Sequence, residues 1–244
     1  MTQTQKKYGL PETYQENPVR TTMDSESGGT YWNPHRLNNA KHYQYAVYTY
    51  ARDVIRKNGF KNLMDIGCGP AMKLRMIHAD LPDLQIIGID QPHPITFCKE
   101  NHPFGQWLSD DFENPNPAHK DLKADLILCS DVIEHVVDPD KLLTYIQSRM
   151  HKDSLVILST PDRDRHYGQG FMKSGHKSHI REWNKAEFAQ YLESEGWQVL
   201  DHFHAQGAKP GLNQAYLHEL IYHFTHKRPL QMDYNQVALL KRKP

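Results

Sequence analysis

Glycines and carboxylates gather around one short segment in the first third of the chain. Residues 62–66 have the pattern of a short apolar strand, and they lead directly into Gly67 and Gly69. Glycine permits a tight turn there and lets a ligand approach the backbone closely. About twenty residues later the second predicted strand ends in Asp90, whose carboxylate can accept two hydrogen bonds from a ribose. The segment therefore predicts a binding site for an adenosine-containing ligand.

Two cofactors compete for this turn, and a plain strand-to-helix turn without a ligand is the third interpretation. A dinucleotide fingerprint requires Gly or Ala at its sixth place, where this chain has Met72. The dinucleotide turn also serves a pyrophosphate, whereas S-adenosylmethionine (SAM) has no phosphate and carries a cationic ammonium and sulfonium. Asp65, two residues before the first glycine, suits that positive charge. The turn thus favours SAM over NAD.

Two motifs make the chain similar to the class I SAM-dependent methyltransferases, in particular the broad group that includes the ubiquinone-type O-methyltransferases. They are DIGCG at residues 65–69 and ADLILCSDVIEHV at residues 124–136, in the expected order and separation. The resemblance runs from about Tyr43 to the end of the sequence, with Ala71 where many members have a third glycine. It implies a Rossmann-like, mostly parallel sheet of seven strands ordered 3-2-1-4-5-7-6, with only the last strand antiparallel. It also implies SAM as cofactor and S-adenosylhomocysteine as product.

The resemblance further implies which residues contact the cofactor. Asp90 would lie at the ribose, and Asp111, or else its neighbour Asp110, would hold the adenine amino group. Ser130 and Asp131, after the fourth strand, would border the methyl group. The full set of expected cofactor contacts is Asp65, Gly67, Cys68, Gly69, Asp90, Gln91, Asp110, Asp111, Phe112, Ser130 and Asp131.

Strand-like and helical patterns alternate over the rest of the chain. We expect strands at residues 62–66, 85–89, 106–108, 125–129, 154–159, 197–204 and 235–241, and helices at residues 37–57, 71–79, 94–101, 139–150 and 184–195. This alternation is typical of an α/β fold with helices on both faces of a largely parallel sheet, whose ligands bind beyond the carboxyl ends of the strands. We expect an N-terminal arm at residues 1–40 and a methyltransferase domain at residues 41–244. We expect residues 207–232 to form an insertion that, together with the N-terminal arm, closes over the substrate or builds a contact in a homo-oligomer.

Histidines near these strand ends are candidates for a general base. A hydroxyl acceptor is largely protonated at neutral pH, so its methylation calls for a base, most often histidine. His135 follows the fourth strand, while His166 and His179 lie in the polar loop after the fifth, which resembles the acceptor loop of methyltransferases that act on sugars or other polyhydroxylated molecules. Alternatively, His135 packs or caps a helix and the other two lie on a solvated surface. Further candidate contacts to the acceptor are Tyr31, Arg36, Tyr43 and Arg181.

Metal binding and several other functions are less favoured. Asp162 and Asp164 could bind a divalent ion with nearby histidines, but Arg163 and Arg165 beside them favour ion pairs, so we expect no metal. The absence of an Asn-Pro-Pro-Tyr or Asp-Pro-Pro-Tyr tetrapeptide argues against methylation of DNA bases or protein amides. The alternatives left open are transfer to nitrogen or carbon of a small metabolite, a non-catalytic SAM-binding partner protein, and a nucleotide-dependent dehydrogenase.

Composition limits the partners and the compartment. The 244 residues include 29 basic and 29 acidic side chains, so net charge gives no attraction to nucleic acid or to an anionic membrane. Cys68, Cys98 and Cys129 match neither a disulfide framework nor a CxxC metal site. No apolar run approaches the roughly 20 residues of a membrane span, and the N-terminus lacks the apolar core of a signal peptide. We expect a cytoplasmic enzyme that binds neither nucleic acid nor membrane and acts on a small-molecule acceptor.

Overall fold

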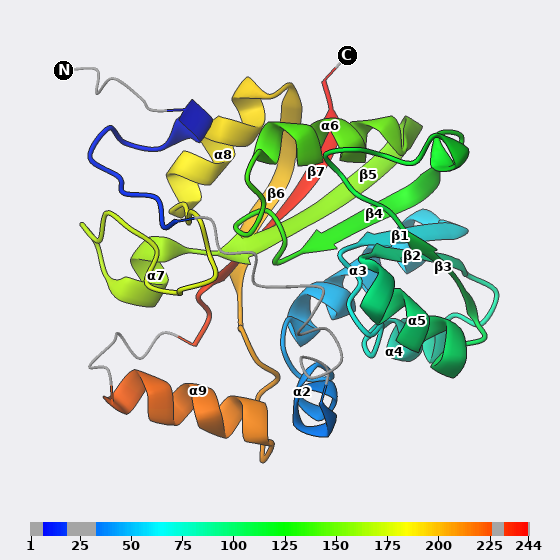
Figure 1. The fold of residues 1–244 in the computed structure, drawn as a ribbon, viewed down its shortest axis with the longest axis horizontal. Coiled ribbons are helices and arrows are strands. Elements are labelled where there is room, and N and C mark those ends of the chain that lie inside the picture. Colours follow the sequence, from blue (N-terminus) through cyan, green and yellow to red (C-terminus); the bar gives the residue numbers. More distant parts are fainter. Residues whose placement is uncertain (1–6, 19–32, 226–231, 244) are drawn as a thin grey trace.

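The computed structural model describes residues 7–18, 33–225 and 232–243 and contains a seven-stranded sheet with the order β3-β2-β1-β4-β5-β7-β6 (Figure 1). The strands are β1 (Asn62–Ile66), β2 (Gln85–Asp90), β3 (Gly105–Ser109), β4 (Ala124–Ser130), β5 (Met150–Pro161), β6 (Trp197–Ala205) and β7 (Asn235–Arg242). Strands β1 to β5 pair in parallel, and β7 runs antiparallel to both β5 and β6. The predicted fold class, strand order and single antiparallel strand are confirmed.

Helices cover both faces of the sheet, and the sequence of β4 shows why. Leu126 and Leu128 pack on the face covered by α3, α4 and α5, whereas Ile127 and Cys129 pack on the face covered by α6 and α8. Successive side chains of a strand point to opposite faces, so a strand buried on both sides is apolar throughout. The helical elements are η1 (Lys7–Gly9), α2 (Pro34–Asn39), α3 (Tyr45–Asn58), α4 (Leu74–Asp80), α5 (Pro92–Asn101), η2 (Pro117–His119), α6 (Pro139–Ser148), α7 (Arg163–Tyr167), α8 (Lys185–Ser194) and α9 (Gln214–Thr225).

The helix expected at residues 37–57 is wrong in one respect, because it is broken between α2 and α3. Gln44 adopts a left-handed backbone with φ of 51°, and its backbone N–H donates to the carbonyl of Gly207. Tyr43 pairs with Ala208 in an isolated bridge. A contact with a distant segment therefore interrupts a pattern that is locally helical.

The helix after the glycine turn begins later than the expected residue 71. Ala71 has a φ of 54° in the left-handed region and cannot belong to a right-handed helix, so α4 starts at Leu74. In contrast, α8 begins as predicted: the Asn184 side chain accepts from the backbone of Glu187, whose carboxylate accepts from the backbone of Asn184.

Part of the expected N-terminal arm packs against the domain. Leu10 and Tyr14 are buried in the core on the α6 and α8 face. Gln15 pairs with Lys173, and the Asn17 side chain donates to carbonyl groups of the loop after β5. Residues 11–17 therefore fasten that loop in place. In the part of the chain that the structure describes, no helix is long and apolar enough to cross a membrane.

Candidate functional site

The glycine turn between β1 and α4 leaves no room for larger side chains. Gly67 has a φ of 78°, and a Cβ on it would lie 2.3 Å from Cγ2 of Val132. The backbone N–H of Gly69 donates to Asp90 at 2.7 Å, which ties the turn to the end of β2. The other carboxylate oxygen of Asp90 accepts from the N–H of Gln91 at 2.7 Å. The turn and the acidic strand end thus form one unit.

Asp65 lies at the carboxyl end of β1 and is fully buried. One of its oxygens accepts from the Tyr48 hydroxyl at 2.8 Å, and the other has no hydrogen-bond partner within the described residues. Burial raises the pKa of Asp65 to about 7, against the Tyr48 hydrogen bond and the charge of Lys73, and burial raises the pKa of Asp90 to about 6. An unpaired buried carboxylate oxygen is costly. A cationic ligand would satisfy it.

Lys73 brings a positive charge to the same place. Its ammonium donates to the carbonyl of Ala40 and to the side chain of Gln44, and it lies over the Tyr48 ring at 4.7 Å. Burial lowers the pKa of Lys73, while the charges of Asp65 and Asp131 oppose that shift. The turn therefore holds both a carboxylate and an ammonium group, which suits a ligand with a zwitterionic amino-acid group.

The loop after β3 contains two neighbouring aspartates with different surroundings. The Asp110 carboxylate accepts from the Tyr145 hydroxyl, from His119 and from two backbone N–H groups, one of them that of Asn116. Although burial opposes it, these hydrogen bonds hold the pKa of Asp110 below its ordinary value. Asp111 is exposed, and among the contacts of the described residues its carboxylate accepts only from the N–H of Glu113. Asp110 anchors the loop, and Asp111 is available to a ligand.

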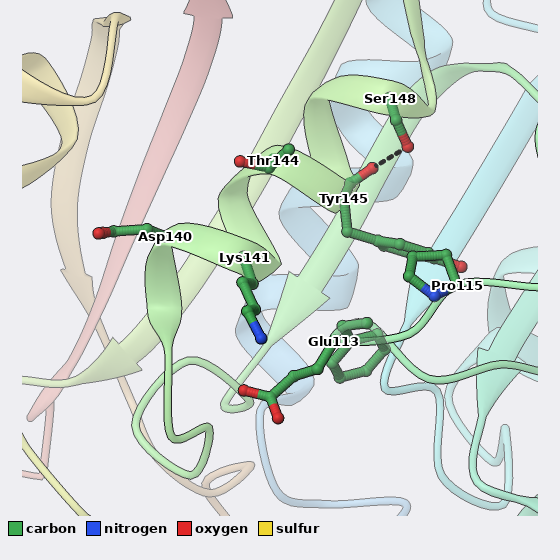
Figure 2. A pocket seen from close by; sticks show the side chains of 8 residues that line it. Glu113, Pro115, Asp140, Lys141, Thr144, Tyr145 and Ser148 are labelled. Carbon is green, nitrogen blue, oxygen red and sulfur yellow. Dashed lines mark hydrogen bonds between the residues drawn. The ribbon is translucent and has the colours of Figure 1, made fainter.

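A hollow of about 360 Å³ lies between this loop and α6 (Figure 2). Its walls are Phe112, Glu113 and Pro115 from the loop and Asp140, Lys141, Thr144, Tyr145 and Ser148 from α6. Phe112 is the single expected cofactor residue among them, and its ring packs against that of Tyr145 with centroids 5.5 Å apart. The hollow therefore borders the expected adenine position without containing the glycine turn.

At the carboxyl end of β4, Asp131 is at the centre of a polar network. Its backbone is left-handed, with φ of 55°. Its carboxylate accepts from Ser159 at 2.8 Å, from Asn235 at 3.1 Å and from Gln44 at 2.8 Å. Because the Ser159 hydroxyl donates to Asp131, it accepts from Ser130 at 2.8 Å. Three segments far apart in the sequence thus fix this carboxylate beside the turn.

His135 and His179 are brought together, with ring centroids 4.6 Å apart and ring planes at 87°. His135 donates its Nδ1 hydrogen to the carbonyl of Ser178 at 2.9 Å, and His179 Nδ1 contacts the buried carboxylate of Glu182. Each ring therefore holds its hydrogen on Nδ1 and leaves Nε2 as a free acceptor. Loss of hydration lowers the pKa of both histidines to about 4; His179 is mostly buried, whereas His135 keeps 37% of its side chain exposed and its shift is increased by the neighbouring His179. Both imidazoles are neutral at physiological pH.

The third candidate base, His166, lies elsewhere. It is on α7, and its ring stacks on Tyr234 with centroids 4.2 Å apart and planes at 7°. Asp162 caps the same helix and also accepts from His204 at 2.8 Å, while Asp164 accepts from Asn184. These contacts join α7 to β6, to the start of α8 and to the segment before β7.

The expected acceptor contacts are dispersed. Arg181 is buried, and its guanidinium donates to Glu16 and to the carbonyls of Val136 and Val137, which fastens the loop to the N-terminal segment. Tyr43 lies at the break before α3, where burial raises its pKa to about 12. Arg36 is exposed on α2, and Tyr31 lies outside the described residues.

Helix α9 lies within the expected insertion, beyond the carboxyl ends of β4 and β5 (Figure 1). One side buries Glu219 and His223, and the His223 ring packs against Tyr234. The other side exposes Leu217, Ile221 and Phe224. Residues 226–231 of the insertion lie outside the described residues.

Four side chains at this edge of the sheet were not identified from the sequence. Gln44, just before α3, Ser159 of β5 and Asn235 of β7 donate to Asp131. Lys73, in the turn before α4, interacts with Asp65 and Asp131 through its charge. Lys73 could have been noticed as a charge directly after the glycine turn. The others have no local signal because their partners are distant in the sequence.

Comparison with known proteins supports the arrangement. Residues 35–202 match the family described as a methyltransferase domain. The small RNA 2'-O-methyltransferase of Gallus gallus is 23% identical over 67% of this chain and 48% of its own length, so the chain spans about half of that relative. The ubiquinone biosynthesis O-methyltransferase of Coxiella burnetii is 22% identical over 59% of this chain and 68% of its own length.

Solved structures show the same fold at low sequence identity. The plantazolicin methyltransferase BamL, bound to a desmethyl-plantazolicin analogue and S-adenosylhomocysteine, has a TM-score of 0.62 at 14% identity and covers 91% of this chain and 92% of its own. An S-adenosylmethionine-dependent methyltransferase from Clostridium acetobutylicum has a TM-score of 0.58 at 12% identity, covering 90% and 99%.

Proposed function

Because the chain belongs to the methyltransferase-domain family and has the fold of the SAM-dependent enzymes, with SAM as its cofactor, we propose that it methylates a hydroxyl group of a small molecule. A sugar or another polyhydroxylated metabolite is the proposed acceptor. The observation that carries this proposal is the pair His135 and His179, two neutral imidazoles with free Nε2 atoms that meet from the loops after β4 and β5. The two relatives named above are O-methyltransferases by name, which supports oxygen as the accepting atom.

The residues of the glycine turn fit SAM. The left-handed backbone of Gly67 forms the tight turn, and the free oxygen of Asp65 suits a cationic group. We assign Lys73 to the carboxylate of the methionine part of SAM, Asp90 to the ribose hydroxyls and Asp111 to the adenine amino group. When bound, SAM supplies an electrophilic methyl group on a sulfonium.

The chain's own residues then orient the acceptor and remove its proton. Methyl transfer is an in-line displacement, so the acceptor oxygen must lie opposite the sulfur at a fixed position. Asp131, whose left-handed backbone is strained and whose carboxylate accepts three hydrogen bonds, borders that position. His135 lies four residues further along the loop after β4, and His179 reaches it from the loop after β5. A neutral imidazole Nε2 accepts the hydroxyl proton as transfer proceeds. Exclusion of water by α9 and the loop after β5 is the proposed role of the insertion.

The test is methyl transfer from SAM to a panel of sugars, polyols and phenols, followed by mass spectrometry of the products. Wild type should give an O-methyl product, and His179→Gln should reduce turnover by about 10²-fold or more, the usual contribution of a general base. His151→Gln is the matched control, since His151 also contacts a carboxylate, that of Asp125, at the opposite end of β4. A product methylated on nitrogen or carbon would refute the hydroxyl assignment, and SAM binding without any transfer would favour a non-catalytic partner protein.

A further inference from the structure

Three potential metal ligands meet directly after β4. A carboxylate oxygen of Glu134 and one ring nitrogen each of His135 and His179 lie within 4.8 Å of one another. Within the described ranges, no other group of three histidine, cysteine or acidic side chains has this geometry. These residues differ from Asp162 and Asp164, the carboxylates considered for a metal from the sequence.

Glu134 provides an independent indication of a ligand. Its side chain is completely buried, and one oxygen accepts from the Thr160 hydroxyl at 2.9 Å. The other oxygen, Oε1, has no hydrogen-bond partner in the described parts of the chain, and it lies 4.0 Å from Nε2 of His135. A buried carboxylate without a countercharge is costly. The atom that lacks a partner is the one that faces the histidines.

The histidines are held as metal ligands usually are. A metal-bound histidine normally donates its second ring N–H to a carbonyl or carboxylate, which fixes the tautomer and the ring orientation. His135 makes this contact with the Ser178 carbonyl, and His179 makes it with the Glu182 carboxylate. Each ring therefore directs an unprotonated Nε2 away from its anchoring partner.

We propose that Glu134, His135 and His179 bind a divalent first-row metal ion that also holds the acceptor hydroxyl. Two imidazoles and one carboxylate leave coordination positions open, and this mixed nitrogen and oxygen set suits Zn²⁺, Mn²⁺, Fe²⁺ or Co²⁺ better than Mg²⁺. Bonds of about 2.1 Å bring ligand atoms to within about 3.5 Å of one another, so binding requires a shift of about 1 Å. The His135 side chain is 37% exposed and can make that shift.

The ion deepens the proposed function, and it depends on that function for the position of the acceptor. A hydroxyl bound to the ion loses its proton more readily, as metal-bound water does. Its O–H bond breaks, and the proton passes to solvent water. The oxygen then bonds to the methyl carbon while the carbon–sulfur bond breaks and its electron pair remains on sulfur. The two imidazoles act as ligands in this scheme, so the ion replaces direct proton abstraction by histidine.

In the experiment, the full chain is first freed of metal with a chelator. It is then titrated with Co²⁺ while visible absorption is recorded, and the titration is repeated with Zn²⁺ by calorimetry. Wild type should bind one ion with a spectrum indicating nitrogen ligands. Glu134→Gln and His179→Gln should each weaken binding by at least about tenfold, the lower end of what loss of even an outer partner costs. His151→Gln should retain wild-type affinity.

Titration of S-adenosylhomocysteine into the same proteins separates the two proposals. One outcome is that wild type binds S-adenosylhomocysteine and still transfers methyl groups in the presence of the chelator, but does not bind metal. That outcome overturns the metal site and leaves a histidine base. Equal metal affinity in wild type and Glu134→Gln also overturns it. Metal binding with no affinity for S-adenosylhomocysteine retains the metal site and refutes the methyltransferase proposal. If Glu134→Gln does not fold, His179→Gln and a metal-dependent rise in the Tm of wild type decide the question.

Discussion

Replacement of Asp90 by Asn should weaken cofactor binding far more than it weakens the fold. The carboxylate receives one backbone N–H on each oxygen, from Gly69 and Gln91, both at 2.7 Å. In our proposal it also accepts the two ribose hydroxyls. Asn keeps one carbonyl oxygen for Gly69 but loses the negative charge and one acceptor. A hydrogen bond to a charged group is worth about 1.5–3 kcal/mol, so we expect a loss of about 2–3 kcal/mol, or about 30- to 150-fold in Kd.

Calorimetric titration of S-adenosylhomocysteine at pH 7.5 measures this effect, with circular dichroism to confirm that each variant is folded. Asp125→Asn is the matched control. Asp125 accepts from the backbone N–H groups of Lys61 and Asn62 at 2.7 and 2.9 Å, but it lies at the opposite end of the sheet. The affinity of Asp125→Asn for S-adenosylhomocysteine should equal that of wild type. A folded Asp90→Asn that binds within threefold of wild type, or an equal loss in Asp125→Asn, would refute the ribose assignment.

Three further predictions concern the turn and its charges. Burial raises the pKa of Asp65 to about 7 and that of Asp90 to about 6. The affinity for SAM should therefore fall as the pH drops through this range, because protonation removes the negative charges that bind the cofactor. A Kd that stays constant in titrations from pH 8 to pH 5.5 would contradict this. Lys73→Met should weaken SAM binding but leave the affinity for adenosine unchanged, and an equal loss for both ligands would mean that Lys73 does not bind the carboxylate. Gly67→Ala should lower the Tm by about 5–15 °C, because backbone strain and overpacking destabilise the fold by about 2–4 kcal/mol. A Val132→Ala background should recover part of that loss, since it removes the atom that lies 2.3 Å from the new Cβ. If the effects of the two substitutions on the Tm are additive, the clash with Val132 is not the cause.

The strands were predictable because their burial leaves a local record. A strand covered by helices on both faces must be apolar along its length, and β4 is apolar from Leu126 to Cys129. The capping box of α8 was also readable, since both partners lie within four residues. The topology came from a family resemblance, because strand order depends on contacts that no short segment encodes.

The features that could not be predicted depend on distant partners. The break before α3 exists because Gln44 bonds to Gly207. The network around Asp131 joins β4 to Gln44, Ser159 and Asn235, and none of these has a signal in its own neighbourhood. His166 and His179 looked equivalent in the sequence, and only the fold places one beside Tyr234 and the other beside His135.

The measurement that tests the central claim most directly is a calorimetric titration of SAM and S-adenosylhomocysteine into the purified, folded chain, with mass spectrometry of any ligand that copurifies. The claim is that the glycine turn, Asp65 and Asp90 bind SAM so that its methyl group faces the acceptor site after β4. We predict one site per chain with micromolar affinity for both compounds, and no competition by NAD. A folded chain that binds neither compound, or that binds NAD instead, would contradict it.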